Sequence, residues 1–185
     1  MTVLDELFSG DDERATAALP RVEAESLPAL VDALVSGDPE SRWWAICALA
    51  HLPGPGAIAA LLAAAAHPDP TVRSVALYAL GERRAEAGVT PLLFALGDPS
   101  AYLARVATDA LIHIGAPAVH GLIRALESDA QPQVRANAAR ALALIGDASA
   151  IPALFHALDD ESVMVLYWAE QALERMGAGQ VYFKP

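Results

Sequence analysis

The chain has 185 residues, of which 55% are hydrophobic and 19% charged, and its formal net charge is −11. This composition excludes a disordered chain, and the lack of clustered positive charge argues against a nucleic-acid binder. No apolar stretch reaches the ~18 residues of a membrane span, and the first residues lack the pattern of a signal peptide. With a single cysteine, Cys47, and no cofactor motif or metal-ligand spacing, we expect a cytoplasmic protein without a cofactor or bound metal.

The N-terminal segment is strongly acidic. Residues 1–40 hold ten acidic and two basic residues, a net charge of −8, whereas residues 41–185 have a net charge of −3. We interpret residues 1–25 as a helical cap that keeps one end of the fold polar. Attraction of a basic partner is the alternative interpretation of the same charge.

From about residue 26 the sequence repeats with a period of 31 residues. Such a period is typical of stacked supersecondary units, because one unit alone cannot bury its apolar face. Three columns hold one residue type through five copies: Ala45, Ala76, Ala107, Ala138 and Ala169; Ala48, Ala79, Ala110, Ala141 and Ala172; and Leu49, Leu80, Leu111, Leu142 and Leu173.

Each copy is predicted to form two helices. The first helix carries an apolar column (Leu30, Leu61, Leu92, Ile123, Leu154), and an Asp-containing turn, often with Pro, caps the start of the second. Glycines 31 residues apart, Gly115, Gly146 and Gly177, suit left-handed ends of the second helices. Asp98-Pro99 comes two positions early, which predicts a longer turn or an extra half-turn there. The predicted repeats span residues 26–52, 55–84, 86–115, 117–146 and 148–177, and residues 178–185 form a tail that either covers the last helix or docks to a partner.

The string Asp-Pro-x-Val-Arg-x-x-Ala-x-x-Ala-Leu, seen from Asp69 to Leu80, resembles HEAT repeats of the short phycobilisome-lyase-like variety. The same pattern recurs from Val134 to Leu142, and the resemblance covers residues 26–177. It implies an all-α, right-handed α-solenoid of about five two-helix HEAT-like repeats with an N-terminal helical cap. It also implies that the recurring arginines, Arg42, Arg73 and Arg135, pair with turn aspartates of neighbouring repeats.

The second helices line the concave face of such a stack, and their remaining columns vary from copy to copy. Core columns repeat because every copy solves the same packing problem, so the variable columns are where a copy can be specialised. Aromatic residues and Arg are enriched at binding hot spots. The predicted partner-binding residues are Trp43, Trp44, Tyr78, Arg105, Asp109, His113, Asn137, Arg140, Tyr167, Trp168 and Gln171. End-packing of the tryptophans is the alternative.

Two pairs four residues apart, Cys47 with His51 and Asp109 with His113, allow a catalytic interpretation. Each pair lacks a third functional group, and the two helices concerned are expected to lie roughly 20 Å apart, two steps of 8–10 Å. We therefore expect a non-enzymatic scaffold that binds a protein partner, and neither nucleic acid nor membrane. A bilin-lyase-like protein that handles a chromophore or another small molecule in the same groove is the alternative. Self-association through Val181-Tyr182-Phe183 or through the end caps is a third hypothesis.

Overall fold

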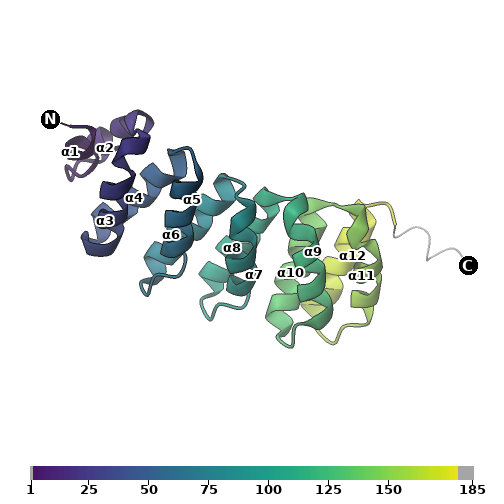
Figure 1. Ribbon diagram of the computed structural model, residues 1–185. Helices are drawn as coiled ribbons and strands as arrows, with labels where there is room; N and C mark the ends of the chain where they lie inside the picture. Colours follow the sequence, from purple (N-terminus) through teal and green to yellow (C-terminus); the bar gives the residue numbers. More distant parts are fainter. Residues whose placement is uncertain (1, 179–185) are drawn as a thin grey trace, which may run out of the picture. The chain divides into compact units, whose positions relative to one another are not determined.

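The structure is a computed structural model that describes residues 2–178. Within that range the regular elements are helices, with no strand. The chain divides into two compact units, residues 1–83 and 84–185, which are called unit 1 and unit 2 and are described separately (Figure 1). The tail predicted at 178–185 lies outside the described residues except for Ala178.

Unit 1 begins with short helices and continues with two longer helix pairs, α3 with α4 and α5 with α6. Leu7, Ala15 and Ala18 are fully buried, and α4 contacts the 3-10 turn η1. The N-terminal region is therefore packed onto the first helix pair. The elements are α1 (Val3–Leu7), α2 (Asp12–Ala18), η1 (Leu19–Arg21), η2 (Ala24–Ser26), α3 (Leu27–Ser36), α4 (Pro39–His51), α5 (Pro55–Ala64) and α6 (Pro70–Glu82).

Unit 2 contains three helix pairs, α7 with α8, α9 with α10 and α11 with α12. Within it α7, α9 and α11 contact one another in succession, as do α8, α10 and α12 (Figure 1). Stacked helix pairs in two layers define an α-solenoid, which confirms the predicted fold class. The elements are η3 (Glu86–Gly88), α7 (Val89–Ala95), α8 (Ala101–Ile114), α9 (Ala116–Ser128), α10 (Pro132–Ile145), η4 (Ala148–Ala150), α11 (Ile151–His156), η5 (Ala157–Asp159) and α12 (Val163–Arg175).

The second helices keep the sequence period: α4, α6, α8, α10 and α12 each begin 31 residues after the one before. Asp38 caps α4 by accepting hydrogen bonds from the Glu40 and Ser41 amides at 2.9 and 3.0 Å. Ser100 takes the cap position of α8, while Asp98 accepts from the Ser100 amide at 2.8 Å. The early Asp98 therefore lengthens the turn and leaves the helix start in register.

Two second helices of unit 2 end at a predicted glycine, but only one of these two glycines has the left-handed helical conformation. Gly146, after α10, is left-handed with φ +73° and ψ +25°. Gly115, after α8, also has a positive φ of +78°, but its ψ of −132° places it outside the left-handed helical region. Gly115 is both the C-terminal cap of α8 and the N-terminal cap of α9, so the chain passes directly from one helix to the next.

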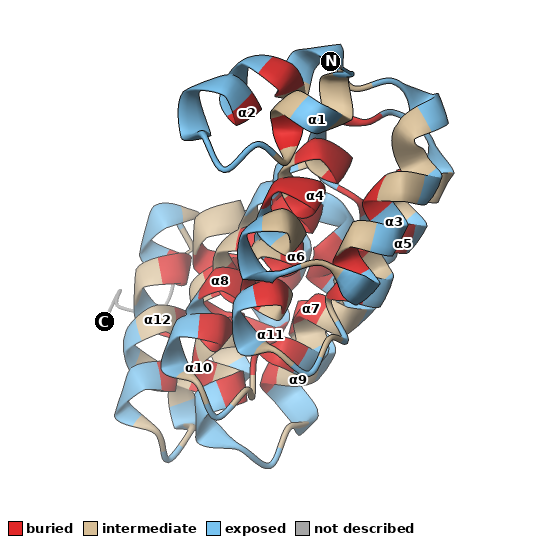
Figure 2. Ribbon diagram, turned by 90° about the vertical axis from the view of Figure 1, so that its left-hand side faces the viewer, coloured by how far each residue is buried: buried red, intermediate tan, exposed pale blue. Residues whose placement is uncertain are grey.

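The invariant columns lie in the core. All fifteen residues of the two alanine columns and the leucine column are at most 3% exposed, and the buried residues follow the inward sides of the helices (Figure 2). Small alanines let the helices approach closely, while each fully buried leucine contributes about 1.5–3 kcal/mol. The first-helix column is correct at Leu30, Leu61, Leu92 and Leu154 but wrong at Ile123, which is half-buried, because α9 turns Leu122 into the core instead.

Candidate interaction surface

The second helices of unit 2 present three neighbouring rows of side chains on one face: positions 102, 133 and 164 are exposed, 105 and 167 are exposed on either side of the buried Ala136, and 109, 140 and 171 are half-buried. Positions 102, 105 and 109 of α8 lie on one helix face, and the equivalent positions of α10 and α12 follow at 31-residue steps. Asp109 on α8 and Arg140 on α10 form an ion pair, so the side chains of one row contact each other across adjacent helices. We call this the unit 2 surface and define it by Tyr102, Arg105, Asp109, Gln133, Arg140, Met164, Tyr167 and Gln171.

A cluster of three charges occupies one side of the unit 2 surface. The Asp109 carboxylate accepts a hydrogen bond from Arg140 Nη2 at 2.8 Å, and Arg105 Nη1 lies 3.5 Å from its other oxygen. The Arg105 guanidinium also lies 5.6 Å from the ring centroid of Tyr102, a cation–π geometry. Exposed ion pairs add little stability. The cluster therefore orients two guanidinium groups around one carboxylate and leaves a net positive charge on the surface.

The unit 2 surface also carries exposed apolar side chains. Tyr167 on α12 is 47% exposed, and its ring meets Trp168 edge to face with centroids 5.2 Å apart. Met164 lies one turn earlier and is also exposed. On the α8 side the Tyr102 ring is 58% exposed. Burial in the core explains none of these three exposed side chains, and such residue types are enriched in binding hot spots.

Trp44 and Asn137 are held within the fold, which corrects the expectation that they are exposed on the binding surface. Trp44 is only 4% exposed and Val106 is buried. Asn137 donates from Nδ2 to the Leu96 carbonyl at 2.9 Å and accepts from Gln133 at 3.2 Å. One residue along a helix turns the side chain by about 100°, and the neighbouring column leaves Trp43, Arg105 and Tyr167 exposed, although Ser74 and Ala136 in the same column are buried.

The remaining predicted residues of unit 2 lie at its margins. His113 is exposed on the last turn of α8, while Gln171 and Trp168 are half-buried on α12. Tyr102 and Met164 were not predicted from the sequence, although they stand three residues before the predicted Arg105 and Tyr167. The i, i+3 relation within one helix face would have found both.

Unit 1 has a cleft of about 370 Å³ at its own second helices. Trp43 and Tyr78 line it and are 42% and 56% exposed. The Trp43 ring meets that of Trp44 edge to face at 4.5 Å. The N-terminal region, which does not follow the repeat, supplies one wall, so the periodic pattern gave no signal for it. The lining residues are Thr16, Leu19, Trp43, Trp44, Ile46, Cys47, Ala50, His51, Val75, Tyr78, Ala79, Glu82 and Arg83.

Hydrogen bonds and ion pairs of the two candidate catalytic pairs involve the Cys47 backbone and the arginines next to Asp109. His51 Nδ1 lies 2.8 Å from the backbone carbonyl of Cys47, to which the protonated nitrogen donates. Burial raises the pKa of the Cys47 thiol to about 11, so the thiol is protonated at neutral pH. The Asp109 carboxylate contacts Arg105 and Arg140 on its two oxygens. Within the part of the chain that the structure describes, no group of three or more His, Cys, Asp or Glu side chains is arranged to hold a metal ion.

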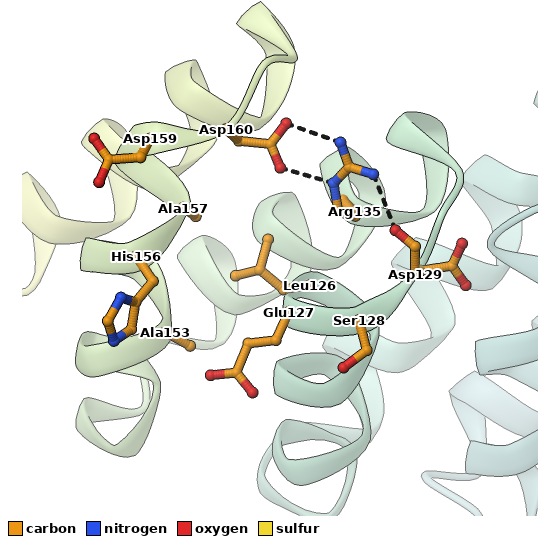
Figure 3. Close-up of a pocket in the computed structure, with 10 residues that line it drawn as sticks. All are labelled: Leu126, Glu127, Ser128, Asp129, Arg135, Ala153, His156, Ala157, Asp159 and Asp160. Atoms are coloured by element: carbon orange, nitrogen blue, oxygen red, sulfur yellow. Dashed lines mark hydrogen bonds and ion pairs between the residues drawn. The ribbon is translucent and has the colours of Figure 1, made fainter.

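Unit 2 has a pocket of about 480 Å³ at the turns that precede α10 and α12 (Figure 3). Arg135 spans it: Nε and Nη2 donate to the two Asp160 oxygens at 2.7 and 3.0 Å, and Nη1 donates to the Asp129 carbonyl at 2.9 Å. Glu127 and His156 project from α9 and α11 beside it. The pair ties the turns of two adjacent repeats together, as the sequence predicted for this arginine.

Comparison with known proteins agrees with this fold. The family model described as HEAT repeats matches residues 12–81, 27–112 and 119–181. The chain therefore belongs to the HEAT-repeat family. No helix of the described residues is long and apolar enough to cross a membrane.

Solved structures with a similar fold include an engineered protein, 22% identical, with 96% of each chain covered and a TM-score of 0.53. Another is a designed armadillo repeat protein in complex with the peptide (KR)4, 20% identical, with 94% of this chain and 98% of that chain covered and a TM-score of 0.53. No curated protein sequence matches the chain.

Proposed function

We propose that this protein is a non-enzymatic interaction scaffold that binds a protein partner on the exposed face of its second helices. The observation that carries the proposal is the unit 2 surface, where exposed Tyr102, Met164 and Tyr167 surround the charges of Arg105, Asp109 and Arg140. The aromatic rings and the methionine would supply apolar burial, and the guanidinium groups would orient the partner.

The unit 2 surface suits a partner that binds as an extended segment across several helices. The three rows of the unit 2 surface run over α8, α10 and α12, so one segment can contact all of them. The designed armadillo repeat protein with a similar fold holds a peptide, which supports this class of partner. His113, Trp168 and Gln171 would contact its flanks, and Trp43 and Tyr78 of unit 1 belong to the same proposal. The single thiol of Cys47 suits a reducing compartment such as the cytoplasm.

Affinity capture from a lysate of the native host tests the proposal. Arg105→Ala combined with Tyr167→Ala removes one orienting charge and one exposed ring, and we expect the captured protein to be lost. Phe94→Ala is the matched control, because Phe94 lies on the first helix α7 and is 90% exposed. Loss of the partner in the control and its retention in the double variant would contradict the proposal.

Chromophore or small-molecule handling of the bilin-lyase kind is the second candidate function. The unit 1 cleft favours it, because its volume of about 370 Å³ lies in the range of small-molecule sites and tryptophans line it. A visible absorption band in freshly purified protein, lost in Trp43→Ala, would support this function. A spectrum with protein absorption only, after incubation with a bilin, would contradict the chromophore version.

A further inference from the structure

The unit 1 cleft is lined mainly by apolar and aromatic side chains. Trp43 and Tyr78 expose rings that no core contact explains, and Leu19, Ile46 and Val75 add aliphatic walls. The cleft therefore offers a large side chain an apolar surface that is open to solvent and flanked by ionisable groups.

The charge around this cleft is negative. Unit 1 holds twelve acidic and five basic residues, a net charge of −7. Glu82 lines the cleft, and Asp12 and Glu13 precede the lining residue Thr16 by four and three positions on α2, which places them on the same side of that helix. The basic residue Arg83 directs its guanidinium to the carbonyls of Leu49 and Leu52. A ligand that combines an aromatic ring with a positive charge complements this arrangement.

One segment of the chain itself has that composition. Residues 178–185, Ala-Gly-Gln-Val-Tyr-Phe-Lys-Pro, leave the repeat pattern and place Tyr182 and Phe183 next to Lys184. Lys184 is the only lysine of the chain. The segment follows α12, the last helix of unit 2, and its final seven residues lie outside the described structure.

We propose that the unit 1 cleft binds Tyr182, Phe183 and Lys184 of a second copy of this chain. An aromatic ring enters the cleft against Trp43 and Tyr78, and the ammonium group of Lys184 faces the acidic edge. This inference rests on the proposed function, because it assigns an occupant to the second-helix face of unit 1.

The contact joins two different surfaces, so it is heterologous. A pair joined by one such contact keeps one unoccupied cleft, on one molecule, and one unoccupied tail, on the other, and association therefore continues as the concentration rises. The acidic edge makes the association weaker at high ionic strength, because salt screens the attraction for Lys184.

Sedimentation velocity of the full chain over a range of concentrations tests the proposal. We expect the weight-average mass to rise with concentration for the wild type and for Phe94→Ser, an exposed aromatic outside the cleft. Phe183→Ser and Tyr78→Ser should each weaken association at least tenfold. A wild type that stays monomeric, or association unchanged by Phe183→Ser, would overturn the proposal.

Mixing the two variants gives the sharper result. Phe183→Ser keeps an intact cleft and Tyr78→Ser keeps an intact tail, so the mixture should form a one-to-one dimer that grows no further. Larger assemblies from the mixture would show a different contact and overturn the proposal. Formation of no dimer would overturn it as well, provided that circular dichroism shows both variants folded.

A peptide of residues 178–185 separates docking within one chain from docking between copies. In a Trp168→Phe, Phe183→Ser background, emission reports on Trp43 and Trp44 only. A saturable change on peptide addition supports the cleft as the binding site, and no change overturns it. Saturable peptide binding together with a monomeric wild type would place the tail in the cleft of its own chain and overturn the second-copy contact. The proposed function has its own readout, loss of a captured protein in the Arg105 and Tyr167 variant, so the two failures are distinguishable.

Discussion

Arg135 shows how a single side chain joins two repeats. It contacts the Asp160 carboxylate through two nitrogens, and both side chains are largely buried, at 17% and 12% exposed. The equivalent Arg73 donates to the His67 and Pro68 carbonyls of its own turn, as Arg135 does to the Asp129 and Ala130 carbonyls, and Nε of Arg42 is buried without a hydrogen-bond partner. The resemblance to HEAT repeats implies pairing with a turn aspartate for all three arginines, and the Arg135–Asp160 pair confirms it for Arg135.

Asp160→Asn tests the contribution of the Arg135 pair. The amide keeps an oxygen for the Ser162 amide, which Asp160 caps at 2.8 Å, but it removes the charge that Arg135 needs. We expect the free energy of unfolding to fall by about 1–3 kcal/mol at pH 7, the range for a charge-assisted hydrogen bond or an unsatisfied buried partner. Urea denaturation measures this value, and an unchanged midpoint would contradict it.

The same pair predicts a pH dependence. Hydrogen bonds from Arg135 lower the pKa of Asp160 in the folded protein, so the stabilisation is complete above the unfolded carboxyl pKa of about 3.9 and is lost as the pH falls through the lower folded value. The stability difference between wild type and Asp160→Asn should stay constant from pH 7 to about pH 5 and shrink below about pH 4. If the stability difference already shrinks above pH 5, its pH dependence comes from a group other than Asp160.

Cys47 should be a slow thiol. Burial raises its pKa from 9.0 to about 11, which lowers the thiolate fraction at pH 8 about 100-fold. Alkylation by iodoacetamide should therefore be much slower in the native protein than in urea, where the thiol is exposed. Equal rates in the two states would show a reactive thiolate and revive the catalytic interpretation of Cys47 with His51.

At the scale of the helix, periodicity predicts what every copy shares. Helix starts, core columns and most turn caps follow from the 31-residue repeat because each copy meets the same packing constraints. The same reasoning failed for Trp44 and Asn137, whose column varies between copies although it is turned toward neighbouring repeats. Variation in a column is therefore a weak guide to exposure when a side chain at an interface between repeats adapts to its own neighbour.

Gly146 tests the left-handed end of α10. Its φ is +73°, and a Cβ placed there would meet no atom within 4 Å, so only the backbone conformation opposes a side chain. Gly146→Ala should lower the free energy of unfolding by about 1 kcal/mol. Gly146→Asn is the matched variant and should cost less, because Asn tolerates this conformation. Equal stability of the Ala variant and the wild type, measured by urea denaturation, would contradict this assignment.

At the scale of the whole molecule, the chain divides into two compact units between Arg83 and Arg84. The repeat continues across this boundary, so periodicity carried no signal for it. Arg84 is exposed and has an unusual φ of +48° for a residue other than glycine. The cleft of unit 1 was equally hidden, because Thr16 and Leu19 reach it from outside the repeats.

Limited digestion with trypsin tests the boundary between the units. We expect the first cleavage at Arg83 or Arg84, which releases two protease-resistant fragments that end and begin there. Arg124 is the internal comparison, because it is also exposed but lies within α9. Earlier cleavage at Arg124 than at the boundary would contradict the division into units.

The central claim is that a protein partner lies on the unit 2 surface, and site-specific photo-crosslinking in the native host tests it most directly. A benzophenone amino acid replaces Tyr102 on the surface in one variant and Phe94 on α7 in the other, and both positions are exposed aromatic residues. We predict a discrete cross-link to another protein from position 102 and none from position 94. The same product from both positions, or a product from position 94 alone, would contradict the claim.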